Sequence, residues 1–101
     1  MILYNVTINI EPEVEQEWIA WMKEKHIQDV METGHFNEYK FLKLLGENPE
    51  ALGNTYAVQY FADDIGKLET YLNTDAPTLQ KEHMDKFGNK FVAFRTVLQE
   101  V

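Results

Sequence analysis

The sequence predicts an α+β fold built from four strands and two helical regions in the order βαββαβ. Three features predict it. Apolar residues alternate at both ends of the chain, two internal segments carry apolar stripes at helical spacing, and glycine and proline residues separate these segments. Strands in this order form one four-stranded antiparallel sheet, and both helical regions cover the same face of it. We therefore expect a ferredoxin-like sandwich with one open sheet face.

The first strand is predicted at residues 2–10, where side chains alternate between an apolar and a more polar face. Pro12 suits the first turn of a helix, and the acidic residues around it complement the helix dipole. The apolar stripe that begins at Trp18 points in a different direction in the later part of this region. We therefore expect the helix to break near Lys25 and His26.

The rest of the chain supplies the second helical region and the other three strands. The helical region is expected to begin at Asp63 or Asp64, which can cap a helix, and to end at Gly88. Proline belongs in a first turn, so Pro77 should start a new helical segment within it. The alternation of apolar residues predicts strands at 35–45, 55–61 and 90–98, with a turn region between 46 and 54.

Because the helices can cover only one face of such a sheet, the composition of the other face decides whether the chain is expected to self-associate. The apolar part of that face would be too large to leave in water, and a second copy is the simplest cover. We therefore expect a homodimer, paired through the sheet face as a dimeric α+β barrel. The residues expected on the open face are Leu3, Phe61, Phe91, Ala93 and Val97, with Asn5, Thr7, Gln59 and Arg95.

Segments along nearly the whole chain resemble a known family. They are Tyr4-Asn5-Val6-Thr7, Trp18-x-x-Trp21-Met22, His26-Ile27-x-Asp29-Val30, Thr33-Gly34-x-Phe36, Tyr56-Ala57-Val58-Gln59-Tyr60-Phe61 and Lys90-Phe91-Val92-Ala93-Phe94-Arg95-Thr96. On these segments the chain resembles the uncharacterised bacterial proteins classed as domain of unknown function 4286. The order of elements is also similar to the dimeric α+β barrel group, which includes antibiotic-biosynthesis-type monooxygenases. The resemblance implies the fold and no substrate.

Composition bounds the remaining possibilities. The 101 residues suit a single domain spanning residues 1–101. The chain has no cysteine, no basic leader segment and no long apolar run, so we expect a cytoplasmic protein without a membrane partner. Its net charge of −8 disfavours nucleic acid as a partner. Recognised metal-ligand patterns and phosphate-binding glycine loops are missing from the sequence, so no metal or cofactor is expected.

Two histidines are the candidate catalytic residues, because imidazole is the usual proton-transfer group near neutral pH. His83 projects from the inward stripe of its helix. It is either a core histidine bonded to the backbone or to a hydroxyl such as that of Tyr60, or a residue that faces a ligand. His26 lies at the expected helix break, where an imidazole can cap the free carbonyls.

Candidate ligand-binding residues come from the strands and the first helix. Arg95 is the chain's only arginine, and it requires either a carboxylate such as that of Glu38 or a ligand anion. The aromatic residues can form a cleft or pack as core. The polar ones can line a pocket or bond across a dimer interface. The set consists of Arg95, Tyr60, Trp18, Tyr4, Gln59 and Asn5.

These features leave three functions open. The first is a dimeric barrel that binds a small molecule, without assured catalysis. The second is a self-associating structural or protein-interaction module. The third is a cofactor-free enzyme of the monooxygenase or isomerase type that uses His83 or His26 to move protons.

Overall fold

The computed structural model describes residues 1–46 and 53–101, and it confirms the predicted order of elements. The turn expected between residues 46 and 54 lies mostly outside the described residues. A 3-10 turn precedes α1, a π-helical segment joins α1 to α2, and a second 3-10 turn follows α4. The elements are β1 (Ile2–Ile10), the turn Pro12–Val14, α1 (Glu15–Trp21), the π-helical segment Met22–His26, α2 (Ile27–Glu32), β2 (Glu38–Lys43), β3 (Asn54–Ala62), α3 (Ile65–Thr74), α4 (Ala76–Phe87), the turn Gly88–Lys90 and β4 (Phe91–Gln99).

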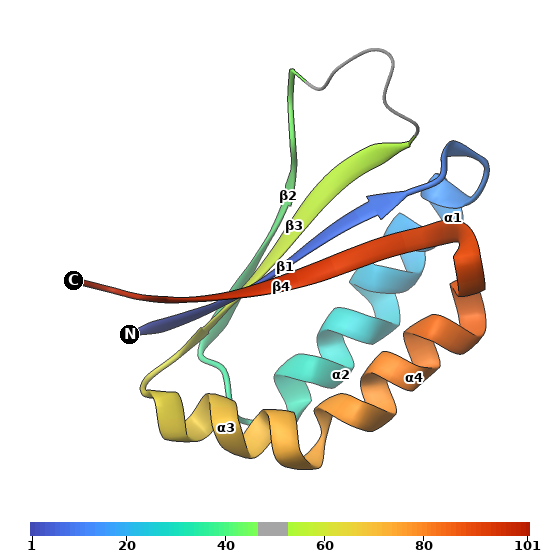
Figure 1. The fold of residues 1–101 in the computed structure, drawn as a ribbon. Coiled ribbons are helices and arrows are strands. Elements are labelled where there is room, and N and C mark those ends of the chain that lie inside the picture. Colours follow the sequence, from blue (N-terminus) through green and yellow to red (C-terminus); the bar gives the residue numbers. More distant parts are fainter. Residues whose placement is uncertain (47–52) are drawn as a thin grey trace.

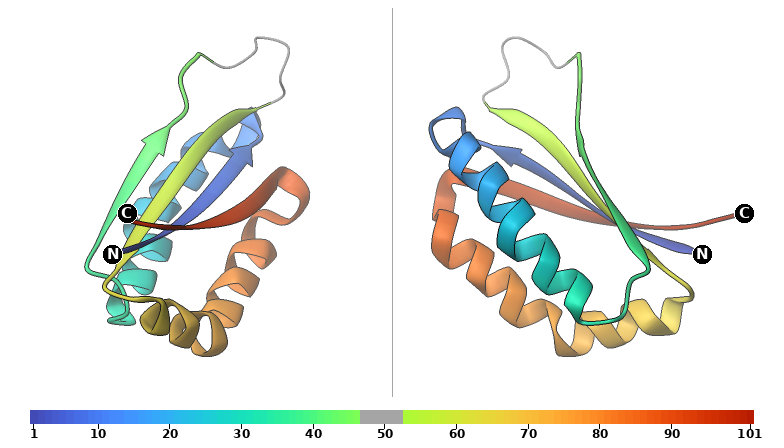
Figure 2. Two further views of the ribbon diagram at one scale, coloured as in Figure 1. Left: turned by 60° about the vertical axis from the view of Figure 1, so that its left-hand side comes forward. Right: turned by 180° about the vertical axis from the view of Figure 1, so that it is seen from behind.

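The four strands form one antiparallel sheet in the order β2-β3-β1-β4. The helices lie on one side of this sheet, and the views in Figures 1 and 2 leave its other side uncovered by any element. Two interleaved βαβ units with their helices on a common face make the α+β ferredoxin-like fold that the sequence predicts. No helix within the described ranges is long and apolar enough to span a bilayer.

The core lies between the sheet and the helices. On β1 the buried residues are those that alternation assigned to the apolar face, because a strand turns successive side chains to opposite sides. The helical stripes meet them from the other side. The most deeply buried large side chains are Trp18, Ile8, Ile10, Met22, Ile27, Leu68, Val30 and Val58.

The helix break predicted near Lys25 and His26 is a π-helical segment. The backbone N–H of Ile27 donates to the carbonyl oxygen of Met22, five residues back, so this hydrogen bond spans one more residue than an α-helical one. The extra residue rotates the following stripe. Met22 and Val30 both face the core as a result, and His26 lies between them.

The predicted orientation of β4 is wrong. The register pairs Val6 with Arg95 and Ile8 with Ala93, and paired residues of neighbouring strands share a face. Phe91, Ala93, Arg95 and Val97 therefore face the helices, and Val92, Phe94, Thr96 and Leu98 are on the open face. The prediction failed because β4 carries apolar residues on both faces. Alternation then indicates a strand without showing which face is covered.

Candidate functional site

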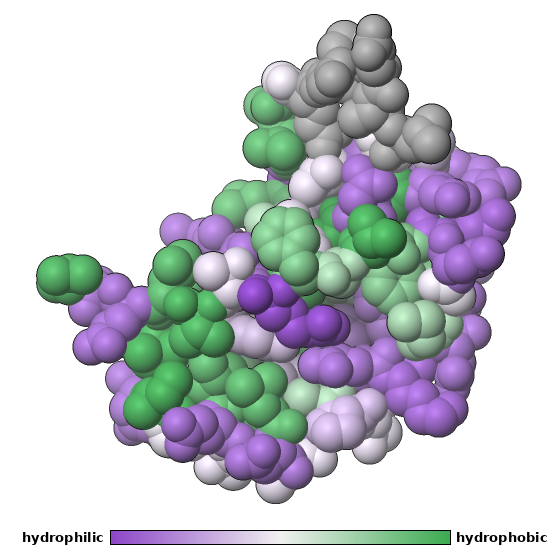
Figure 3. Space-filling view, viewed as in Figure 1, coloured by the Kyte–Doolittle hydropathy of each residue, from purple (hydrophilic) through white to green (hydrophobic). Residues whose placement is uncertain are grey.

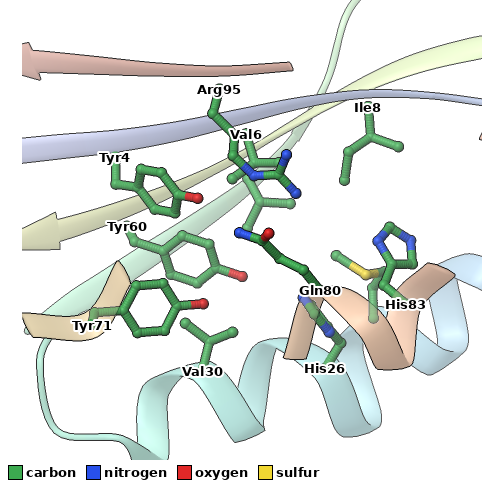
Figure 4. A pocket seen from close by; sticks show the side chains of 12 residues that line it. Tyr4, Val6, Ile8, His26, Val30, Tyr60, Tyr71, Gln80, His83 and Arg95 are labelled. Carbon is green, nitrogen blue, oxygen red and sulfur yellow. The ribbon is translucent and has the colours of Figure 1, made fainter. Parts of the chain in front are cut away.

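A small hollow lies between the sheet and the helices, in the middle of the fold. Its volume is about 30 Å³, roughly the share of one water molecule in the liquid. Its lining mixes aliphatic side chains with the polar ends of long ones, which come from three strands and four helical elements (Figure 4). The lining residues are Tyr4, Val6, Ile8, Met22, His26, Val30, Val58, Tyr60, Tyr71, Gln80, His83 and Arg95.

Three tyrosines form one side of the hollow. Tyr4 comes from β1, Tyr60 from β3 and Tyr71 from α3, and their hydroxyl groups point the same way, toward the interior space (Figure 4). The ring centroid of Tyr4 is 6.2 Å from that of Tyr60 and 6.1 Å from that of Tyr71. Burial raises the pKa of all three hydroxyls above the ordinary value. They remain protonated at neutral pH and can donate hydrogen bonds.

Arg95 and Gln80 face the tyrosines from β4 and α4 (Figure 4). Both act on the Tyr4 hydroxyl. Burial raises the pKa of that hydroxyl, and the charge and hydrogen bonding of Arg95 partly offset the rise, with a smaller effect of Gln80. Within residues 1–46 and 53–101, Arg95 forms no ion pair with a carboxylate. The pairing with Glu38 within one chain is wrong, because Glu38 is on the open face of the sheet.

His83 is buried and held by a tryptophan. Its side chain is 5% exposed, and its Nε2 accepts a hydrogen bond of 3.0 Å from Nε1 of Trp18. An indole N–H can only donate, so Nε2 carries the lone pair and the proton of the neutral ring is on Nδ1. The ring stacks on Phe91 at a centroid distance of 4.0 Å. Burial lowers the pKa of His83 to about 3, with smaller contributions from His26 and Arg95.

His26 presents a nitrogen without a partner. Its Nδ1 is buried and makes no hydrogen bond in the part of the chain that the structure describes. Burial lowers the pKa of His26 to about 4, against the opposing effect of Glu82 and Asp29. The capping role expected for His26 is wrong, because the helical backbone continues through it into α2.

The two histidine rings lie close together and share a neighbour. Their centroids are 5.4 Å apart, and Trp21 stacks on both, at 5.1 Å from His26 and 5.4 Å from His83. The known proton position on His83 makes it a hydrogen-bond donor toward other groups. Of these two histidines, His26 has a buried ring nitrogen without a partner in the described ranges, which can exchange a hydrogen bond with a bound molecule.

The structure brings five of the eight predicted site residues together at this hollow: Tyr4, Tyr60, His26, His83 and Arg95. Trp18 lies behind His83 and does not line the space. Gln59 and Asn5 pair with each other on the open face of the sheet, where the Asn5 amide donates to Thr7 Oγ1 at 3.0 Å.

Sequence reasoning missed Tyr71 and Gln80. Tyr71 flanks the apolar stripe of α3, and Gln80 precedes His83 by three residues, which places the two on the same side of α4. That spacing was the available signal for Gln80. In residues 1–46 and 53–101, no group of three or more His, Cys, Asp or Glu side chains is arranged to hold a metal ion.

Comparison with known proteins finds one matching family and several solved structures with the same fold. The family described as "Domain of unknown function (DUF4286)" matches residues 1–101. A comparison with curated proteins finds no match. Several solved structures share the fold at low sequence identity, which supports the architecture alone.

A protein from Bacillus halodurans described as of the "ethyl tert-butyl ether d (ethd) family" superposes with a TM-score of 0.70 at 17% identity, covering 100% of both chains. An antibiotic biosynthesis monooxygenase gives a TM-score of 0.67 at 12% identity, over 100% of this chain and 99% of the other. A dimeric ferredoxin-like protein from an uncultured marine organism gives 0.62 at 13% identity, over 99% and 97%. The α+β ferredoxin-like fold is thus shared with proteins of different activities, and the side chains of the hollow must indicate the function.

Proposed function

Since this protein belongs to the DUF4286 family, a domain of unknown function, we propose a function from its own side chains. We propose that it binds a small molecule at the hollow between the sheet and the helices. One observation carries the proposal. Polar groups from several elements converge there, and one of them, Nδ1 of His26, is buried without a hydrogen-bond partner among the described residues, while the guanidinium of Arg95 beside it pairs with no carboxylate in those ranges.

The polar lining of the hollow supports this proposal. Buried polar groups cost free energy unless they are hydrogen-bonded, and apolar residues would fill the same space without that cost. Three tyrosine hydroxyls, an amide, two neutral histidines and an arginine instead surround a space of about 30 Å³. A ligand that inserts a polar atom into this space gains hydrogen bonds that the protein cannot make by itself.

We expect the indole N–H of Trp18 to report binding in ¹H–¹⁵N spectra, because it bonds to the ring of His83. Benzoate, benzamide and phenol at millimolar concentration serve as probes. At least one should shift the Trp18 resonance and leave the backbone amides of β2 in place. Filling the hollow with Val30→Phe should weaken that binding about tenfold or more, because the new ring takes the space that the polar group of the probe would enter.

The matched control is Val97→Phe, which adds the same ring on β4 at a half-exposed position outside the hollow, and it should preserve binding. If Val30→Phe unfolds the chain, Gln80→Leu tests the same site with a polar group removed. Probes that leave Trp18 unmoved, or that bind Val30→Phe and Gln80→Leu as well as the parent, would refute the hollow as a ligand site.

A second function is favoured by the open face of the sheet, and we propose that two copies pair through it. Its apolar side chains are well exposed: Val92 is 70% exposed, Phe94 64% and Leu98 49%. Leu42, on the same face of β2, is 45% exposed. Between these apolar residues runs a polar row across the strands, consisting of Lys40, Gln59, Asn5 and Thr96.

A large exposed apolar surface of this kind is typical of an interaction site. The self-complementary face suits a twofold dimer, in which Gln59 and Asn5 would bond across the interface. One solved structure with this fold is described as dimeric. The pairing would also explain why two of the predicted polar site residues lie away from the hollow.

Light scattering at micromolar concentration should therefore give twice the chain mass of 11.9 kDa. Phe94→Lys should shift the protein to the monomer, because a charge on this face would have to be desolvated in the interface. Ile65→Lys is the matched control: Ile65 is 47% exposed at the start of α3, on the helix side, and its replacement should leave the mass unchanged. A parent protein of 11.9 kDa would disprove self-association.

A further inference from the structure

A second space opens beside the hollow, as a groove between β4 and α4. Its volume is about 320 Å³, within the usual range for small-molecule sites. Three residues line both the hollow and the groove: Gln80, His83 and Arg95. The groove therefore meets the hollow at the arginine. Beyond these three residues the groove is lined by Met84, Phe91, Val92 and Ala93.

This side of the molecule is open to solvent. β4 is an edge strand of the sheet, so its outer side pairs with no other strand of the chain described by the structure. Figure 3 shows hydrophobic side chains, in green, exposed along the course of β4 and interrupted by hydrophilic ones. The groove provides an apolar surface that can be reached from outside, with the polar hollow behind it.

The charge at the junction of the two spaces is positive. The guanidinium of Arg95 stays protonated under all ordinary conditions, and no carboxylate among the described residues neutralises it. The two histidines are neutral at pH 7, because burial lowers their pKa values to about 4 and about 3. The two carboxylates whose charges act on His26, Glu82 and Asp29, both pair with Lys25, at 3.1 Å and 2.7 Å. The junction thus offers one unmatched positive charge.

The sizes of the hollow and the groove indicate a ligand with one small part and one larger part. The hollow accepts about one non-hydrogen polar atom with its hydrogen bonds, and the hydroxyls of Tyr4, Tyr60 and Tyr71 point into it (Figure 4). The groove is about ten times larger, and beyond the three shared residues its lining is apolar. A molecule that fits both therefore has a small anionic head and a larger apolar body. A carboxylate is the head with the matching geometry, because a guanidinium can hold one carboxylate through two parallel hydrogen bonds.

We propose that the ligand is a monocarboxylic acid with an apolar body. Its carboxylate lies against Arg95 and Gln80 with one oxygen directed into the hollow, and its body lies in the groove between β4 and α4 against Met84 and Phe91. The inference rests on the proposed ligand-binding function and adds the chemical class of the ligand. The single charge of Arg95 favours a monoanion, since a second carboxylate would have to enter the apolar groove.

Four probes separate the contributions of head and body: octanoate, octanamide, acetate and suberate, each titrated against the parent protein with Trp18 as the NMR reporter. Octanoate should bind about tenfold or more tightly than octanamide, because a hydrogen bond to a charged group is stronger than one to a neutral group. Acetate, which has the head alone, and suberate, which has a charge at each end, should both bind more weakly than octanoate.

Two variants test the named residues. Arg95→Met should reduce octanoate binding to the level of octanamide, whereas Lys81→Met, which removes a positive charge from an ion pair elsewhere on α4, should keep the preference. Met84→Glu places a negative charge in the groove. It should weaken octanoate about tenfold and acetate less, because only octanoate places its body there.

The outcomes distinguish this inference from the function on which it rests. If octanamide shifts the Trp18 resonance and binds as tightly as octanoate, the hollow binds small molecules and the carboxylate inference is wrong. An Arg95→Met variant that keeps the full preference for octanoate would also overturn it. If neither these probes nor the aromatic ones move Trp18, both proposals fail together.

Discussion

Acidification from pH 7 to pH 5 should lower the free energy of unfolding by about 4 kcal/mol, about 2 kcal/mol for each of His26 and His83. The pKa of His26 is lowered from 6.5 to about 4, and that of His83 from 6.5 to about 3, in both cases chiefly by burial. Below pH 6.5 the unfolded chain binds a proton at each histidine, and the folded chain does not. Stability therefore falls with pH throughout this window.

Urea unfolding at a fixed protein concentration, repeated across this pH range, measures the effect. The double variant His26→Gln, His83→Gln should take up about two fewer protons on unfolding at pH 5, which appears as a shallower dependence of stability on pH. His35→Gln is the histidine control. His35 contacts Asp75 at 3.1 Å and does not line the hollow, so its replacement should keep the steep dependence. An unchanged slope in the double variant would mean that the two histidines are hydrated in the folded protein.

Below about pH 5 a buried carboxylate adds to the loss. Glu15 is 8% exposed, and it accepts hydrogen bonds from the Tyr56 hydroxyl at 2.5 Å and the Asn54 amide at 2.7 Å. The bond from Tyr56 is the main reason that the pKa of Glu15 is lowered. A carboxyl group of this kind stabilises the fold above its unfolded pKa and loses that effect as pH falls through its folded value. The histidine test therefore belongs between pH 5 and pH 7.

Trp18→Ala should destabilise the protein by about 3–5 kcal/mol, a large part of the roughly 5–15 kcal/mol typical of a domain. Trp18 has no exposed surface, and its ring packs against Tyr56 at 5.1 Å and Phe41 at 5.6 Å. Truncation opens a cavity in the core. It also removes the donor to Nε2 of His83, which then remains buried without a partner.

The midpoint and slope of urea unfolding measure this loss. Trp21→Ala is the matched control, because Trp21 is the same residue type on the same helix and is only partly buried. It should cost clearly less. Trp18→Phe should fall between the two, since it keeps most of the packing and loses the indole N–H. Equal costs for Trp18→Ala and Trp21→Ala would contradict the role assigned to Trp18.

The sequence determined those features of the fold that repeat locally. Alternation along β1 predicted which of its faces is buried, because only one face of this strand is mainly apolar and that face must point into the core. The mismatch between the stripes of Trp18 and Val30 predicted the helix break, although only the structure identifies it as a π-helical segment. The residue types of His83, Arg95, Tyr4 and Tyr60 were enough to make them site candidates, without showing which of them meet.

The tertiary structure alone decided the orientation of β4 and the membership of the site. Arg95 faces the helices because it pairs with Val6. The sequence of β4 cannot predict this register, because the strand has apolar residues on both faces. Gln59 and Asn5 lie on the open face, as alternation along their strands predicts, whereas Gln80 joins the hollow only because α4 packs beside β4. Local periodicity is set by backbone geometry within one element. The convergence of side chains depends on how distant elements pack together, which no single segment specifies.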